Sequence, residues 1–123
     1  MPKGYWGRIV FINLSTGCIE VEEPPEELYR RHLGGYGLGV HYLYKRIPPG
    51  TDPLGPDNIL AFLPGLLTGS GAQFSGRFMV AARSPLTGAW GEANCGGDFG
   101  PSLRGAGWDG VFISGQAEKP VYI

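Results

Sequence analysis

The sequence predicts an α+β fold with mostly antiparallel or mixed β-sheets and a few short helices. Three observations support this prediction: an alternating run near the N-terminus that is typical of a β-hairpin, two consecutive helical stretches after it, and several short apolar strands beyond them. A doubly wound fold would instead alternate strands with helices along the chain. The expected order is therefore a hairpin, two helices, strands, one short helix and further strands.

The expected hairpin covers residues 7–23. Residues 9–14 form a dense run of apolar side chains rich in β-branched residues, and residues 15–17 supply the turn. In the returning half, apolar residues alternate with glutamates, which is typical of a strand with one polar face. This segment is therefore predicted to form two antiparallel strands.

Two helices are expected, in the stretches 24–35 and 35–50. In the first stretch, Pro25 lies where a first-turn proline is tolerated, acidic residues follow it, and basic residues precede a pair of glycines. The second stretch carries a broad apolar stripe and ends at two consecutive prolines. A polar loop rich in turn-forming residues then extends to residue 58.

Further strands are predicted at residues 59–65, 76–83, 89–94, 109–115 and 119–123. A short helix is expected within residues 98–108, with Pro101 in its first turn. Phe99 and Leu103 are expected to anchor this helix in the core. Its N-terminal amides are then expected to point toward the surface that Arg77 and the turn at residues 94–97 share, which would suit a phosphate.

Composition and charge exclude several classes of protein. The 123 residues fit a single domain with a modest core, and 10 Lys and Arg against 11 Asp and Glu show no signature of nucleic-acid or anionic-membrane binding. The longest apolar run, residues 59–67, is shorter than the ~20 residues of a membrane span, and the N-terminus has no signal-peptide pattern. Cys18 and Cys95 are far apart, so neither a disulfide framework nor a zinc site is expected. A reducing, cytoplasmic setting is the default.

Three motifs admit both a functional and a structural interpretation. The GGYGLG run at residues 34–39 superficially resembles a dinucleotide-binding loop, but a helix precedes it instead of a strand, which favours a helix-to-helix turn. His32 and His41 have no metal-binding or acidic partner at a useful spacing, and we interpret them as surface or interface histidines. Cys95 precedes two glycines, yet no base or cation activates it by sequence position, so a structural role is favoured over a nucleophile.

Arg77 and the Asn-Cys-Gly-Gly segment at residues 94–97 are the remaining candidates. Composition alone favours a simple turn, because Asn and Gly tolerate turn conformations. The functional alternative is a bare backbone surface for a large anionic ligand, since glycine-rich turns bind anions and a guanidinium binds phosphate bidentately. A tight turn between paired strands predicts that Arg77 and Asn94 are near neighbours on one concave surface.

A longer pattern carries a resemblance across nearly the whole chain. The segments that carry it are GRIVFINLSTGCIEVEE, LGGYGLGVHYLY, DPLGPDNILAFLPGLLTG and SGRFMVAARSPLTGAWGEANCGGDFGPSLRGAGWDGVFISGQAEKPVYI. Together they resemble the N-terminal domain of the aldehyde ferredoxin oxidoreductase family, tungsten enzymes with a bis-pterin cofactor. The resemblance implies a domain of two related β-sheets on which the pterins lie. It also implies that residues 1–123 are the N-terminal part of this tungstopterin-binding domain and are incomplete.

Single residues match the family's pattern. The resemblance implies that Arg77 contacts a pterin and approaches a 4Fe-4S cluster, and that the Gly96 backbone touches the cofactor. It further implies that the Asn94 backbone carbonyl helps to hold a magnesium ion bridging the two pterin phosphates. The family's cluster-ligating cysteines and acid/base residues lie in later domains, so no catalytic residue is expected in this chain.

The resemblance implies an enzyme that oxidises aldehydes to carboxylates with ferredoxin as electron acceptor. Two alternatives remain open: a ring-reducing subunit of the same family in a larger complex, and a stand-alone cofactor- or protein-binding module. The expected partners are ferredoxin, the remaining domains of the same polypeptide and further copies in a homo-oligomer, with no nucleic acid and no membrane. The isolated chain is expected to be inactive and to self-associate through sheet edges and an apolar face.

Overall fold

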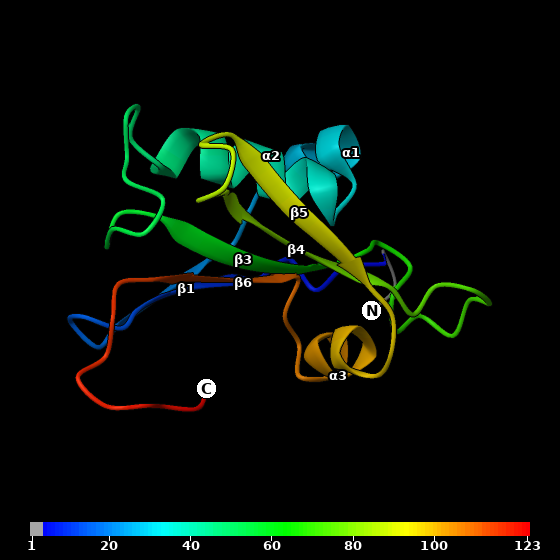
Figure 1. The fold of residues 1–123 in the computed structure, drawn as a ribbon. Coiled ribbons are helices and arrows are strands. Elements are labelled where there is room, and N and C mark those ends of the chain that lie inside the picture. Colours follow the sequence, from blue (N-terminus) through cyan, green and yellow to red (C-terminus); the bar gives the residue numbers. More distant parts are fainter. Residues whose placement is uncertain (1–3) are drawn as a thin grey trace.

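The computed structural model describes residues 4–123. The central element of the fold is a six-stranded mixed β-sheet (Figure 1). Helices α1 and α2 lie on one face of the sheet and α3 lies on the other (Figure 1). The elements are β1 (Ile9–Asn13), β2 (Cys18–Glu22), α1 (Glu26–His32), α2 (Tyr36–Arg46), β3 (Ile59–Pro64), β4 (Phe78–Arg83), β5 (Trp90–Cys95), α3 (Phe99–Gly105) and β6 (Gly110–Ser114). None of the helices described has the length and apolar character needed to cross a bilayer. The arrangement confirms the predicted α+β class with a mixed sheet.

The strands lie in the spatial order β2-β1-β6-β3-β4-β5. The pairs β1–β2 and β4–β5 are antiparallel hairpins, which the sequence pattern predicts. Strand β6 lies between β1 and β3, parallel to the first and antiparallel to the second, so that Phe112 is placed beside Phe11 and Ala61. The last strand of the chain therefore joins the first hairpin to the rest of the sheet.

Each face of the sheet buries its own apolar cluster. The larger cluster lies beneath α1 and α2 and consists of Ile9, Phe11, Tyr29, Leu38, Tyr42, Leu43, Ile59, Ala61, Leu63, Met79, Ala81 and Phe112. On the α3 side, Val10, Ile12 and Val111 form a smaller cluster, against which Leu103 and Trp108 pack. Because successive strand residues point to opposite faces, the continuous apolar runs of β1 and β6 supply both clusters.

Residues 119–123 do not form the strand that the sequence predicts. The chain turns away from the sheet after β6, and its end runs below the sheet in Figure 1. Val121, Tyr122 and Ile123 are exposed there, and Pro120 has no N–H to donate to a neighbouring strand. The sequence is suited to a strand, but without a pairing partner its backbone groups remain bonded to solvent.

Helix α3 uses different residues from those predicted to anchor it. Leu103 does pack against the smaller cluster, but Phe99 is 48% exposed, with its ring against those of Phe62 and Phe78. The buried positions of α3 are Gly100 and Arg104, which lie one turn apart. The prediction for Phe99 is therefore wrong, because the helix turns its Arg104 side toward the protein interior.

Arg104 is buried because it forms an ion pair with Asp109, which has no exposed surface. The Asp109 carboxylate also accepts hydrogen bonds from the Tyr29 hydroxyl (2.8 Å) and from the backbone N–H groups of Trp6 (2.9 Å) and Gly7 (2.6 Å). Burial first, and then the Asp109 carboxylate, raise the pKa of Tyr29. We call these groups the Asp109 cluster. It joins the N-terminal segment to α1, to α3 and to the start of β6.

The first two residues of the GGYGLG run, Gly34 and Gly35, lie in the turn between α1 and α2, and the other four form the first turn of α2; the run therefore joins two helices, in agreement with the helix-to-helix interpretation. Gly35 has a φ of 50° and is the N-cap of α2, and its N–H donates to the Pro64 carbonyl of β3 at 3.1 Å. A Cβ on Gly37 would collide with the backbone carbonyl of His32 at the end of α1. The glycines therefore allow two helices and a strand to approach one another closely.

Replacing Gly37 with alanine is expected to destabilise the chain by about 1–3 kcal/mol, the usual cost of overpacking a tight contact. The new methyl group would meet the His32 backbone, which cannot move without shifting α1. Gly105→Ala is the matched control, because a Cβ at that helical position would enter open space. Urea unfolding followed by circular dichroism measures the difference. A Gly37→Ala midpoint equal to that of the unmodified chain would contradict the expectation.

Candidate functional site

Arg77 lies immediately before β4, and its backbone is fixed to the protein interior. Its carbonyl accepts hydrogen bonds from the Thr68 hydroxyl (2.7 Å) and from the Gly65 N–H (3.4 Å). Thr68 is only 2% exposed, whereas Arg77 is exposed. The Gly65 carbonyl accepts a hydrogen bond from Arg104 at 3.0 Å, so the Asp109 cluster is connected to the Arg77 backbone. The chain thus holds the Arg77 backbone while leaving the guanidinium at the surface.

The β4–β5 hairpin brings Asn94 beside Arg77. In the strand register Asn94 pairs with Met79, two residues after Arg77. The Arg77 Nε donates to the Asn94 side-chain oxygen at 2.5 Å, and its Nη2 donates to the Asn94 backbone carbonyl at 3.0 Å. The predicted proximity of these two residues is confirmed.

Gly96 and Gly97 add bare backbone next to the guanidinium. The position that a Gly96 Cβ would take lies 3.6 Å from the Arg77 Nη1, and a Gly97 Cβ would have no atom within 4 Å. Gly97 also has a φ of 95°, which residues with side chains rarely adopt. Both glycines are exposed, as are Arg77 and Asn94. The surface offers guanidinium N–H donors, a carbonyl oxygen and open backbone to a ligand with anionic and hydrogen-bonding groups.

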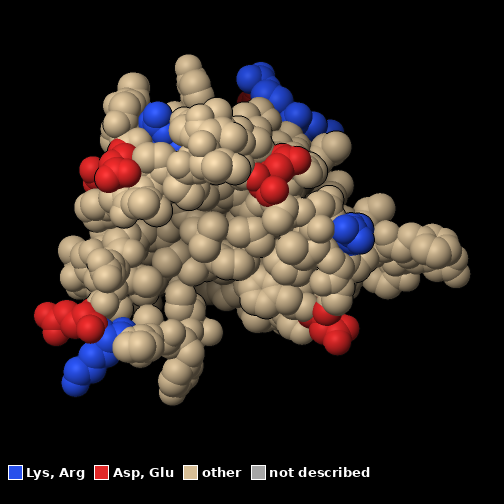
Figure 2. All heavy atoms as spheres, in the orientation of Figure 1, with Lys and Arg blue, Asp and Glu red and all other residues tan. Residues whose placement is uncertain are grey.

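Charge elsewhere on the molecule is dispersed. On the face shown in Figure 2, isolated acidic and basic side chains are separated by wide uncharged areas. The formal net charge of the whole chain is −1. An anionic ligand at Arg77 would therefore be recognised by local contacts with the guanidinium and the backbone, not by a broad positive field.

Three side chains that the sequence did not single out lie next to this surface: Tyr36, Trp90 and Glu92. The hydroxyl of Tyr36, the first residue of α2, donates to Glu92 Oε1 at 2.9 Å, and the Trp90 indole N–H donates to Glu92 Oε2 at 2.7 Å. Trp90, Glu92 and Asn94 alternate along β5 and therefore share one face of the strand. That alternation is visible in the sequence, but the contact with Tyr36 depends on where α2 packs.

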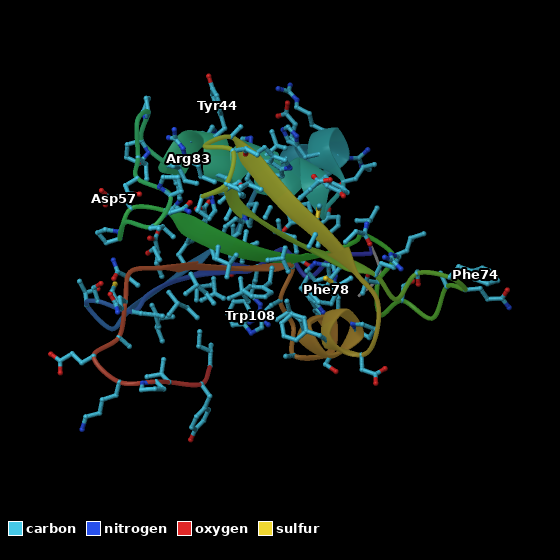
Figure 3. All side chains as sticks on the ribbon, in the orientation of Figure 1. Tyr44, Asp57, Phe74, Phe78, Arg83 and Trp108 are labelled. Carbon is cyan, nitrogen blue, oxygen red and sulfur yellow. The ribbon has the colours of Figure 1, made fainter. Side chains whose placement is uncertain are left out.

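Cys95 lies on the opposite face of β5 from Asn94. Its partner in the strand register is Phe78, whose ring packs against Phe99 of α3; Figure 3 shows Phe78 beside that helix. Cys95 therefore points to the α3 side of the sheet, away from the network around Glu92. Within residues 4–123, no three His, Cys, Asp or Glu side chains are grouped so as to hold a metal ion.

A family profile described as "Aldehyde ferredoxin oxidoreductase, N-terminal domain" matches residues 9–123. The chain belongs to the aldehyde ferredoxin oxidoreductase family. It is 51% identical over 120 residues to the tungsten-containing aldehyde ferredoxin oxidoreductase of Thermococcus kodakarensis, and 50% identical over 120 residues to that of Pyrococcus furiosus. Each alignment covers 98% of this chain and 20% of the relative. The chain thus spans one fifth of the length of these curated relatives.

The aldehyde ferredoxin oxidoreductase family fold also matches a solved structure. A chain of the active-site complex BamBC of benzoyl coenzyme A reductase, in complex with 1,5-dienoyl-CoA, superposes with a TM-score of 0.93 and 32% sequence identity. The alignment covers 98% of this chain and 18% of that chain. The mixed sheet with short helices on both faces is therefore shared with a family relative whose named activity differs.

In this family member, helices α1 and α2 bring His32 and His41 together, with ring centroids 5.0 Å apart. Both histidines are half-buried, which agrees with their interpretation as surface or interface residues. Burial first, and then the positive charges of Lys45 and His32, lower the pKa of His41, while Glu22 opposes them. The pair belongs to the contact between the two helices and takes no part in the hydrogen bonds that Arg77 makes to Asn94.

A titration of the His41 ring by NMR is expected to give a pKa below the ordinary value of 6.5. The folded pKa lies below the unfolded one, so the stability from this residue is present above pH 6.5 and is lost as the pH falls through the folded pKa. Replacing His41 with glutamine should therefore reduce the drop in melting temperature on acidification. His32→Gln, which removes one neighbouring positive charge, should raise the pKa of His41. A His41 pKa at or above 6.5 in the unmodified chain would contradict this account.

A cavity of about 590 Å³ lies between α2 and the β4–β5 hairpin. Its lining is mainly apolar and includes Val40, Tyr44, Trp90 and Arg83. Figure 3 shows Tyr44 and Arg83 on this side of the molecule. The lining includes neither Arg77 nor Asn94, so the cavity is separate from the surface that these two residues form with Gly96 and Gly97. Trp90 lines the cavity and also lies next to that surface.

Proposed function

We propose that this chain is the cofactor-binding segment of a tungsten–pterin oxidoreductase that oxidises aldehydes to carboxylates with ferredoxin as electron acceptor. In this reaction an aldehyde and a water molecule give a carboxylate, three protons and two electrons, and the electrons pass to ferredoxin. The observation that carries the proposal is the exposed surface made by the Arg77 guanidinium, the Asn94 carbonyl and the Gly96 backbone. The relatives named as tungsten-containing aldehyde ferredoxin oxidoreductases support it, because half of the aligned residues are identical to theirs.

The residues at this surface fit a pterin that carries phosphate. Within the described part of the chain, Arg77 Nη1 has no hydrogen-bond acceptor, so it can bind a ligand that lies over Gly96. The Asn94 carbonyl accepts one hydrogen bond from Arg77 and keeps its second lone pair for another group. A side chain at Gly96 would stand between such a ligand and the guanidinium.

In the proposed holoenzyme, Arg77 binds a pterin and the Gly96 backbone contacts the cofactor. The Asn94 carbonyl would contribute one oxygen ligand to a magnesium ion bound with the cofactor, which suits an ion that prefers oxygen ligands. When bound, tungsten would supply the acceptor for the two electrons of the aldehyde. A 4Fe-4S cluster, ligated by residues outside this chain, would supply the electron transfer toward ferredoxin.

The segment is proposed to act within a longer cytoplasmic polypeptide that assembles as a homo-oligomer. The alignments support a longer polypeptide, because they cover one fifth of each named relative. Strand β2 is an edge strand with exposed apolar side chains, Ile19 at 66% and Val21 at 51%. Such an edge is a surface that further protein would cover.

The similarity to BamBC of benzoyl coenzyme A reductase favours a second candidate function, a ring-reducing subunit of a larger complex. The same cofactor surface would then serve a low-potential reduction instead of aldehyde oxidation. The lower identity, 32% against 51%, makes this the less favoured candidate.

The test is to produce the complete polypeptide that contains this segment, without oxygen and with tungstate, and to measure tungsten per chain and viologen reduction. Stoichiometric tungsten and aldehyde-dependent reduction are expected, with no turnover by the 123-residue chain alone. Reduction of an aromatic thioester without aldehyde oxidation would favour the ring-reducing candidate. A complete, folded polypeptide that binds no metal–pterin cofactor would overturn both and leave the stand-alone binding module. Turnover by the isolated chain would contradict the assignment of the electron path to other domains.

A further inference from the structure

A set of hydrogen bonds crosses the exposed edge of the sheet beside Arg77, and we call it the β5 network. Its members are Arg77, Asn94, Glu92, Trp90 and Tyr36. At one end, the two carboxylate oxygens of Glu92 accept from the Tyr36 hydroxyl and the Trp90 indole. At the other end, Arg77 binds Asn94 through two hydrogen bonds. All five side chains belong to exposed residues, so core packing does not account for their orientation.

Tyr36 joins helix α2 to strand β5 through its hydrogen bond to Glu92. The hydrogen bond to Glu92, followed by burial, raises the pKa of Tyr36. Glu92 lies two residues before Asn94 and on the same face of β5. The bond between Tyr36 and Glu92 therefore fixes the part of β5 that carries Asn94, and Asn94 in turn accepts two hydrogen bonds from Arg77.

Helix α2 gives Tyr36 a rigid support. The residue before it, Gly35, is bonded to the Pro64 carbonyl of β3, and Leu38, one half-turn later, is completely buried. A surface arginine otherwise samples many rotamers, and ordering it when a ligand binds reduces affinity. Contacts that order the side chain beforehand remove part of that cost.

We propose that Tyr36 and Glu92 are positioning residues that hold Asn94, and through it Arg77, in the orientation in which Arg77 binds the cofactor. The proposal rests on the proposed function of the Arg77 surface. Tyr36 binds Glu92 and so holds the part of β5 that carries Asn94 beside α2, and Asn94 orients the guanidinium through two hydrogen bonds. Neither Tyr36 nor Glu92 needs to touch the cofactor for this role. Removing the Tyr36 hydroxyl should therefore loosen Arg77 without unfolding the protein.

The test uses Tyr36→Phe in the complete polypeptide, with Tyr44→Phe as the matched control on the same helix. Tyr44 is 88% exposed and lies outside the β5 network. Tyr36→Phe should shorten the half-time of tungsten loss during dialysis about two- to tenfold, the effect expected of one hydrogen bond. It should also change the electron paramagnetic resonance spectrum of the tungsten centre while keeping the unfolding temperature. Tyr44→Phe should change none of these. A Glu92→Ala variant should behave as Tyr36→Phe does.

A double-mutant cycle shows whether Tyr36 acts through Arg77. In an Arg77→Ala background, Tyr36→Phe is expected to have no further effect on the half-time of tungsten loss. If the two substitutions shorten the half-time of tungsten loss by factors that multiply, the proposal is overturned. It is also overturned if Tyr36→Phe speeds tungsten loss and at the same time lowers the unfolding temperature. If Arg77→Ala shortens the half-time but Tyr36→Phe does not, this inference fails alone. If Arg77→Ala has no effect on the half-time, both this inference and the proposed function of the Arg77 surface fail.

Discussion

Replacing Asp109 with alanine is expected to destabilise the chain by about 3–5 kcal/mol, the usual cost of breaking a buried ion pair by removing one partner. The substitution leaves the Arg104 guanidinium buried without its counter-charge. It also removes the acceptor of the Tyr29 hydroxyl and of the Trp6 and Gly7 N–H groups. Because a typical domain is stable by about 5–15 kcal/mol, the loss is a large share of the total.

Urea unfolding at equilibrium measures this loss, and two variants serve as comparisons. Asp98→Ala removes an exposed aspartate at the start of α3 that makes no side-chain capping bond, and it should change stability little. Tyr29→Phe removes one hydrogen bond of the Asp109 cluster and should cost about 1 kcal/mol. An Asp109→Ala variant as stable as Asp98→Ala would show that the Asp109 cluster does not support the fold.

Arg77→Ala in the complete polypeptide is expected to increase the rate of cofactor loss about 10- to 100-fold, the effect of losing one to two hydrogen bonds to a charged group. The fold should be unaffected, because the Arg77 side chain is exposed and the residue contacts the protein interior through its backbone carbonyl. Tungsten and pterin content per polypeptide during dialysis measures the loss, and circular dichroism checks the fold.

Two further variants test whether the effect of Arg77→Ala is specific to the position and to the guanidinium group. Arg83→Ala removes an arginine at the other end of β4, where Nε bonds the Gly88 carbonyl, and should leave cofactor retention unchanged. Arg77→Lys keeps the charge but lacks the planar fork that binds Asn94 at two atoms, so an intermediate loss is expected. Equal retention in Arg77→Ala and Arg83→Ala would show that Arg77 does not hold the cofactor.

Local patterns in the sequence were sufficient to predict most elements. The β1–β2 hairpin followed from alternation and a turn, and both helices followed from prolines and glycines at their ends, because these signals act over a few residues. The contact between Arg77 and Asn94 was predictable for the same reason: a short turn between paired strands leaves their far ends adjacent. The roles of these two residues and of Gly96 toward a cofactor stay predictions.

Packing overrode the sequence pattern at two places. Residues 119–123 have a strand-like sequence but no neighbouring strand, and Phe99 is displaced from the core by the side of α3 that carries Arg104. Arginine is a poor candidate for burial when it is considered alone. Its burial becomes favourable only beside a carboxylate that the fold supplies, and Asp109 reaches that position through the start of β6.

The sequence by itself determined the types of the main elements, the two hairpins and the candidate surface at Arg77, and its resemblance indicated the family that the comparisons confirm. Only the tertiary structure decided that β6 lies between β1 and β3, that Asp109 meets Trp6 across 103 positions and that Tyr36 meets Glu92 across 56. Periodicity and turn signals describe neighbours along the chain. Contacts between distant segments depend on how complete helices and strands pack, and no local pattern specifies that packing.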